Sequence, residues 1–208
     1  MWSRVIVVST VLLSMSSCGS SQSLPPTQDK PARAAEQGAA PVSPIQQLRM
    51  QAEKGDVEAQ FALAQAYDRG RNVPRDKTEA IRWYRRAAEQ GDAFAQFALG
   101  NNNWEGTGVL KNEKEAVRWW YAAAAQGFAP AQNSLGRTLA TGSLGVPPDK
   151  IQAYVWLALS AQQGDQEADQ QRVALSKQLK PEQVAKAKRL IKEWKPTRPR
   201  AVVSGNSP

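Results

Sequence analysis

The side chains that most often carry catalysis are scarce in this chain of 208 residues. It contains no histidine and a single cysteine, Cys18. The commonest general base and the commonest transition-metal ligand are therefore missing, and neither an internal disulfide nor a cysteine-ligated metal cage can form. No serine is followed three residues later by a lysine, so the S-x-x-K nucleophile arrangement is missing as well. The residues predict no catalytic residue, no metal site and no cofactor.

The sequence around Cys18 predicts a covalent modification of this residue rather than catalysis. We expect residues 1–17 to be a secretory signal peptide, because Arg4 precedes an apolar run that is too short to span a bilayer. The serines before Cys18 resemble a bacterial lipobox, although Met15 stands where leucine is preferred. With Gly19 after the cysteine, this resemblance implies secretion across the inner membrane and a lipid anchor at Cys18 in the outer membrane, facing the periplasm. The alternative is an ordinary signal peptide that leaves Cys18 as a free thiol.

Two segments have the composition of unfolded chain. Residues 18–43 are rich in serine, glutamine, proline and alanine, which bury too little apolar surface to offset the entropy lost on folding, so we expect a flexible linker. Residues 196–208 predict a disordered basic tail. The net charge is +8, with most of the excess between Lys177 and Arg200. This clustering favours a solvated face, and no nucleic-acid partner is predicted.

The body of the chain is an internal repeat. Units of 36, 36 and 37 residues begin at Gly55, Gly91 and Gly127 and cover residues 55–90, 91–126 and 127–163. The additional residue of the third unit falls in the loop Gly142–Gly145, where an insertion costs little. The repeat period sets the fold class, because each unit is one supersecondary element.

Each unit predicts a helical hairpin. In the first helix, an alanine is followed four residues later by a leucine on the same face, and a glycine then ends the helix. A polar residue with Glu or Gln three positions later predicts a capping box for the second helix; these pairs are Asp76 and Glu79, Asn112 and Glu115, and Asp149 and Gln152. Tryptophans at a common position of the second helix are expected to be core residues: Trp83, Trp119 and Trp156.

Hairpins of this kind cannot bury their apolar faces alone, so we expect them to stack as an all-α solenoid. Residues 45–54 predict an unpaired second helix at the N-terminal end. Residues 164–195 predict a degenerate fourth hairpin that closes the C-terminal end, and the repeat domain as a whole spans residues 44–195.

The repeated motifs resemble the Sel1-like repeat family of the tetratricopeptide-like superfamily. The resemblance is carried by AQ-x-x-L-G, the G-x-G-V loop, A-x-x-W-Y/W and AA-x-x-G, each in register. A glycine at the unit end and a period of 36 favour this family over tetratricopeptide repeats. Two residues depart from its pattern: Asn103 replaces a usual tyrosine, and Asn72 replaces a loop glycine, a position that asparagine tolerates.

This resemblance implies a non-enzymatic scaffold that binds another envelope protein through the first helices, which line the concave face of related solenoids. Transferred to this chain, the predicted partner-binding residues are Phe94, Phe97, Asn101, Trp104, Phe61, Gln65, Asp68, Asn133 and Arg137. Trp104 is expected to be exposed. Phe61 and Phe97 are either exposed or wedged between hairpins.

Two alternatives stay open. The basic C-terminal cap can bind an anionic polymer or lipid headgroups, which moderate salt would release. Some relatives have been linked to β-lactam binding or hydrolysis, but this chain lacks their paired cysteines. The sequence does not predict the partner's identity, the pathway or the oligomeric state.

Overall fold

The structure is a computed structural model that describes residues 43–143 and 145–197. The expected signal peptide, Cys18 and nearly all of the expected linker lie outside these residues. The described part contains nine helices and no strand: α1 (Pro44–Glu53), α2 (Val57–Arg69), α3 (Lys77–Glu89), α4 (Ala93–Glu105), α5 (Glu113–Ala125), α6 (Ala129–Thr141), α7 (Lys150–Ala161), α8 (Gln166–Ser176) and α9 (Pro181–Glu193). Within the same residues, none of these helices has the length and apolarity needed to cross a membrane.

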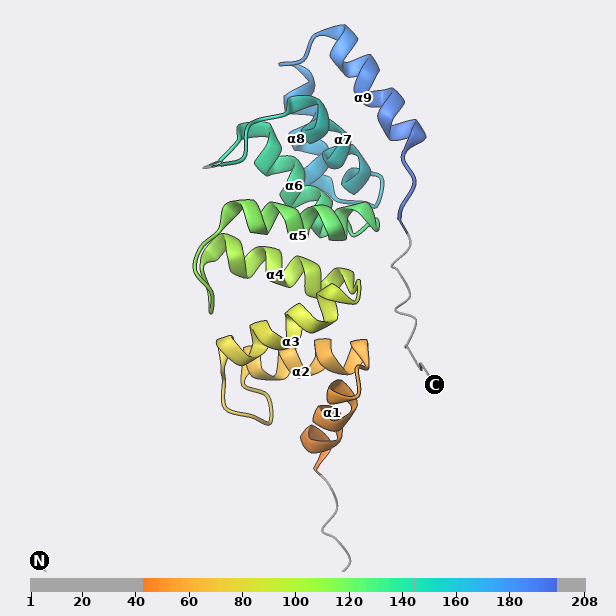
Figure 1. Ribbon diagram of the computed structural model, residues 1–208. Coiled ribbons are helices and arrows are strands. Elements are labelled where there is room, and N and C mark those ends of the chain that lie inside the picture. Colours follow the sequence, from red (N-terminus) through yellow and green to blue (C-terminus); the bar gives the residue numbers. More distant parts are fainter. Residues whose placement is uncertain (1–42, 144, 198–208) are drawn as a thin grey trace, which may run out of the picture. The chain divides into compact units, whose positions relative to one another are not determined.

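The helices pair and stack in chain order (Figure 1). Extensive contacts join α2 to α3, α4 to α5 and α6 to α7, which makes three hairpins. Each hairpin packs on the next through α3 against α4 and α5 against α6, while α1 packs on α2 and α8 on α7. The last helix, α9, packs back on α7. The all-α solenoid predicted from the repeat is confirmed.

Aspartates start most of the first helices. Asp56, Asp92 and Asp165 accept hydrogen bonds from the backbone N–H groups of the residues three positions later, at 2.7, 2.6 and 3.0 Å. These side chains satisfy donors that a helix start leaves unpaired. In α6 the equivalent residue is Phe128, which makes no such bond.

Of the two hydrogen bonds that make up each expected capping box in the second helices, only the one accepted by the cap side chain forms. Asp76, Asn112 and Asp149 accept from the backbone N–H three residues later, each at 3.0 Å. The return bond from Glu79, Glu115 or Gln152 is missing in these helices, and the two glutamates instead accept from arginines three residues later on the same helix. Glu79 accepts from Arg82 at 2.7 Å and from the Trp83 indole at 2.9 Å.

The residue added to the third unit changes the end of α6. Gly106 ends α4 in the left-handed conformation, with φ 76° and ψ 30°. Gly142 has a similar φ of 75° but an extended ψ of 171°. The chain then turns tightly, and the backbones of Ser143 and Val146 pair at 2.9 and 3.0 Å. The insertion thus turns the chain so that Ser143 borders the groove described below.

The interior is built from the recurring leucines and small residues. Leu63, Leu99 and Leu135 have no exposed surface. A side-chain carbon at Gly100 would lie 2.3 Å from the Trp120 ring, so only glycine lets α5 approach this closely. Trp83 and Trp156 are buried as predicted, but Trp119 is only half-buried. Trp120 takes the interior place beside it.

Buried glutamines connect successive hairpins. Gln60, Gln96 and Gln132 each donate to a backbone carbonyl near the end of the preceding second helix, at 3.0 to 3.1 Å. Their amide oxygens accept from Gln90, Gln126 and Gln163 of the following helix end, at 2.7 to 2.9 Å. The glutamine of the AQ motif therefore satisfies polar groups that stacking would otherwise bury unpaired.

Candidate functional site

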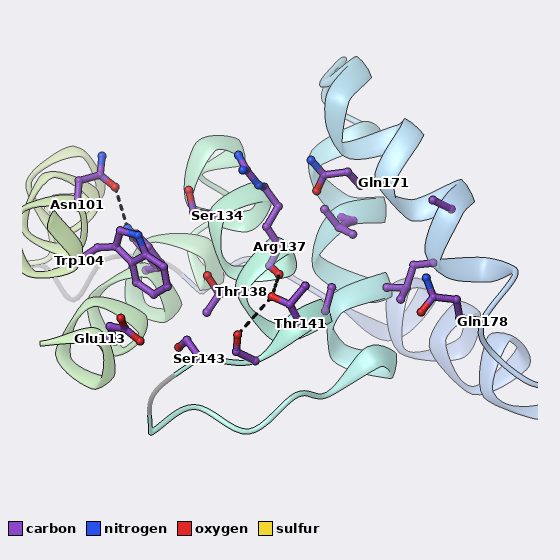
Figure 2. A pocket seen from close by; sticks show the side chains of 16 residues that line it. Asn101, Trp104, Glu113, Ser134, Arg137, Thr138, Thr141, Ser143, Gln171 and Gln178 are labelled. Carbon is purple, nitrogen blue, oxygen red and sulfur yellow. Dashed lines mark hydrogen bonds between the residues drawn. The ribbon is translucent and has the colours of Figure 1, made fainter.

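A groove of about 810 Å³ crosses the face formed by the first helices α4, α6 and α8. Figure 2 shows its lining, with Asn101 and Trp104 at one end, Arg137 in the middle and Gln171 and Gln178 at the other end. Leu157 of α7 and Leu175 of α8 also line it. The groove joins elements of the second hairpin, the third hairpin and the C-terminal cap.

The α4 end of the groove is aromatic. The rings of Trp104 and Trp120 lie 5.3 Å apart at an angle of 40°. The Trp120 indole N–H donates to the Asn101 side-chain oxygen at 3.0 Å, which fixes the orientation of both groups. The Lys111 ammonium lies 5.7 Å from the centre of the Trp104 ring and pairs with Glu113 at 2.8 Å.

The centre of the groove carries Arg137. Its side chain is 59% exposed, and its guanidinium lies 3.4 Å from Glu167, whose side chain is 61% exposed. The hydroxyls of Ser134, Thr138 and Thr141 surround it on the same helix. Exposed ion pairs contribute little stability, so the guanidinium can change partners easily.

The far end is polar and uncharged. Gln171 comes from α8, and Gln178 comes from the segment that follows α8. Ser143, from the turn after α6, lies nearer to Thr138 and Glu113 than to these two glutamines (Figure 2). The Ser143 hydroxyl is buried and makes no hydrogen bond within the described residues. Lys150, at the start of α7, donates to Gln178 at 3.0 Å.

The structure places three of the nine predicted partner-binding residues in this groove: Asn101, Trp104 and Arg137. Trp104 is half-buried rather than exposed as expected, because it packs against Trp120. Asn133 lies one turn from Arg137 but donates to Asp165 at 2.8 Å. It helps to hold the start of α8 and does not line the groove.

The other aromatic residues of the predicted set form a separate ladder. Phe94 is 56% exposed, and its ring lies 5.8 Å from Phe61 and 4.8 Å from Phe128. Phe97 lies 5.4 Å from Phe128 and is half-buried, as is Phe61. Sequence reasoning missed Phe128, which occupies the position of the capping aspartates Asp56 and Asp92. The replacement of the capping aspartate by an aromatic residue was the sequence signal that could have identified Phe128.

Gln65 and Asp68 lie on α2, away from the groove. Asp68 is paired with Lys77. Gln65 borders a small pocket between α1 and α2. The structure therefore divides the nine predicted residues among the groove, the aromatic ladder, these two residues of the first hairpin, and Asn133, which is bonded to Asp165.

The ionisable groups suit binding better than acid–base chemistry. Burial, with a smaller contribution from Asp68, raises the pKa of Tyr84 to about 12, so this phenol stays neutral. Glu113 and Arg137 are the charged groups that line the groove. No cluster of three or more potential metal-binding side chains occurs among the described residues. The groove offers indole faces, hydroxyls, amides, the Glu113 carboxylate and one exposed cation, which are groups that can bind and orient a ligand.

Comparisons with known proteins bear on the whole repeat domain. A family model described as Sel1 repeat matches residues 57–92, 93–128 and 129–165, and each match begins at the first residue of α2, α4 or α6. No curated protein sequence matches the chain.

Solved structures are similar to the chain as well. The crystal structure of a Sel1 repeat protein from Oxalobacter formigenes has 39% identity and a TM-score of 0.58, and the match covers 62% of this chain and 96% of that one. The protective antigen c5321 of uropathogenic Escherichia coli, which has an SLR fold, has 30% identity and a TM-score of 0.47, with 72% and 40% covered. Cysteine rich protein B of Helicobacter pylori has 30% identity and a TM-score of 0.38, with 38% and 60% covered.

Proposed function

The chain belongs to the Sel1 repeat family, and from this premise we propose that it is a non-enzymatic scaffold that holds a segment of a partner protein in the groove across α4, α6 and α8. Sel1 repeat proteins are generally protein-interaction scaffolds without catalytic activity. The specific proposals are the groove as the binding site and the lack of catalysis in this chain.

The groove's composition is the observation that supports the proposal. Tryptophan and arginine anchor protein interfaces more often than other residues, and Trp104 and Arg137 line one groove from neighbouring first helices. A volume of about 810 Å³ accommodates several side chains of an inserted segment. The aromatic ladder, with Phe94 exposed in its middle, extends the apolar surface of α4 towards its N-terminal end.

A photocrosslinking experiment tests this site. Thr141 is exposed and lines the groove, whereas Arg85 is exposed on α3, a second helix, and does not line it. With a benzophenone amino acid at either position in intact cells, we expect a discrete crosslinked partner from position 141 and none from position 85. Trp104→Ala should remove that crosslink while circular dichroism shows an intact fold. Equal crosslinking at both positions would contradict the proposed site.

We also propose that the scaffold works in the bacterial envelope, tethered to the outer membrane through an acylated Cys18 after residues 1–17 are removed. The support is the sequence alone: a short apolar segment, small residues before the lone cysteine, and a polar segment after it. The partner is then another envelope protein that reaches the groove from the periplasm.

One observation favours a second function, binding of an anionic polymer at the C-terminal cap. Lys186, Lys188, Arg189 and Lys192 are exposed on α9, and none forms an ion pair with another described residue. The apolar residues of α9 pack on the core, so binding there would be electrostatic. Retention on dextran sulfate that is lost at moderate salt, and lost when these four residues become glutamine, is the expected result. Retention by the four-glutamine variant would exclude this surface.

A further inference from the structure

We propose that the groove selects an extended, acidic segment, in which a carboxylate displaces Glu167 from Arg137 and an apolar side chain of the same segment packs on Trp104. This inference rests on the proposed function and names the chemistry of its partner. It follows from the charges in the groove and from the placement of its two anchor residues on different first helices.

Arg137 is poised to exchange its partner. Its guanidinium and the Glu167 carboxylate lie 3.4 Å apart, and both side chains are mostly exposed. An ion pair in this setting is screened by water and contributes little stability. A carboxylate delivered into the groove can instead meet the guanidinium with two parallel hydrogen bonds, which is the strongest geometry available to arginine. Glu167 thus acts as a weak internal competitor.

The remaining charges leave the groove positive. Glu113 is only 11% exposed and is already neutralised by Lys111 at 2.8 Å. Lys150 donates to the uncharged Gln178 and forms no ion pair with a described residue. Glu105, at the end of α4, does not line the groove. Once Glu167 is displaced, an incoming acid therefore meets Arg137 without an uncompensated negative charge in the lining, and Lys150, outside the lining, adds positive charge beside Gln178.

The two anchor residues lie on different first helices. Trp104 is on α4 and Arg137 is on α6, and the extensive packing contacts between these hairpins run through α5. A segment that contacts both anchors must cross the groove from one first helix to the next, and an extended chain does so with the fewest residues. An extended segment leaves its own backbone groups unpaired. The exposed Thr141 hydroxyl lines the groove, and the Gln171 amide, which donates to Glu167 at 2.9 Å, becomes available when Glu167 is displaced.

The probe for this inference is a phage-displayed library of random 12-residue peptides, selected on the full-length chain carrying Cys18→Ser. We expect enriched peptides to combine Asp or Glu with Trp, Phe or Leu, one for each anchor residue. By fluorescence anisotropy, Arg137→Gln should weaken the best peptide about tenfold through loss of a charged hydrogen-bonded contact. Glu167→Gln should strengthen the same peptide, because it removes the competitor. Arg85→Gln is the matched control and should leave affinity unchanged.

The possible outcomes distinguish a failure of this inference from a failure of the proposed function on which it rests. Peptides that need Trp104 but lack an acid, or that bind Glu167→Gln more weakly, would overturn the acidic selectivity and leave the groove as the site. Peptides indifferent to both Trp104→Ala and Arg137→Gln, or no enrichment at all, would overturn the groove itself. Arg137 and Glu167 are exposed, so their variants are expected to fold like the wild-type chain.

Discussion

Asp165 shows how one side chain links neighbouring hairpins. Burial on its own raises the pKa of this carboxyl group, but hydrogen bonds from the Ala168 backbone, the Ser160 hydroxyl and the Asn133 amide outweigh burial and lower the pKa below its usual value. A depressed pKa means that the ionised carboxylate stabilises the fold above its unfolded pKa of about 3.9. That contribution is lost as pH falls through the folded pKa.

We therefore expect Asp165→Asn to lower the free energy of unfolding by about 1 kcal/mol at pH 7, because an amide nitrogen in place of the second oxygen cannot accept from Ser160 and Asn133. The difference from wild type should shrink as pH falls from 5 towards 3, as measured by urea unfolding. Asp92→Asn is the control, because burial raises the pKa of Asp92. A raised pKa makes stability fall as pH rises, so its difference from wild type should grow as the solution is acidified. Parallel pH profiles for the two variants would contradict this assignment.

Gly100 and Trp120 form a pair that differs between units. A methyl group on Gly100 would lie 2.3 Å from Trp120, whereas the first unit has Ala64 with Tyr84 at the equivalent positions. We expect Gly100→Ala to destabilise the fold by about 1–3 kcal/mol through overpacking. Adding Trp120→Tyr should recover much of that loss in thermal unfolding, because it recreates the pair of the first unit. A double variant no more stable than Gly100→Ala alone would show that the clash is not the cause.

At the scale of elements, the sequence predicted which helices exist because the repeat fixes their periodicity and ends. The sequence could not show which of two adjacent apolar residues on a helix is buried. Trp119 matches the apolar spacing of Ala116 and Ala123, yet only Trp120 is buried in α5, whereas both counterparts in the first hairpin, Trp83 and Tyr84, are buried. The missing return bonds of the predicted capping boxes have a related reason. Glu79 had several reachable partners, and only the folded geometry decides among them.

The candidate site was less predictable than the fold. Helical spacing correctly put Asn101 and Trp104 on one face of α4, but it carries no information on contacts with other hairpins. Trp120 from α5 and Ser143 from an inserted turn enter the groove from elements that the stripe did not include. Asn133 has the helical spacing of the predicted stripe, but its side chain donates to Asp165 of the next unit and does not line the groove.

The segment after α9 is an element whose contribution can be measured. The Trp194 ring lies 6.5 Å from Trp156, nearly perpendicular to it, and the Thr197 backbone N–H donates to the Ala125 carbonyl at 2.8 Å. Residues 194–197 thus connect the C-terminal cap to the end of α5. Thr197 already lies in the stretch that the sequence predicts as a disordered tail.

We expect Trp194→Ala to destabilise the protein by about 2 kcal/mol, less than for a fully buried tryptophan because Trp194 is half-buried. Since solenoid hairpins contact only their neighbours, hydrogen exchange should accelerate in α7 to α9 and stay unchanged in α2 and α3. Trp119→Ala, which truncates a half-buried tryptophan of α5, should affect the middle of the stack instead. Uniform acceleration in both variants would argue for a single cooperative unit.

At the scale of the whole molecule, two features compete to explain any association with the membrane: an acyl group on Cys18 and the basic face of α9. Acyl chains hold a protein by burying methylene groups, which salt does not oppose. Lysines on a helix surface hold it by charge, which moderate salt screens. The two mechanisms therefore differ in a property that fractionation can measure.

We expect wild type to incorporate labelled palmitate and to remain in the outer-membrane fraction after a wash in high salt. Cys18→Ala should lose the label and appear in the soluble fraction, while the groove keeps its affinity for a selected peptide because the substitution lies outside the repeat domain. Changing the four exposed cations of α9 to glutamine should leave the anchored protein in place. If Cys18→Ala instead stays on the membrane in low salt and leaves it in high salt, the basic helix is the anchor and the acylation proposal is wrong, because only a charge-based attachment responds to screening in that way.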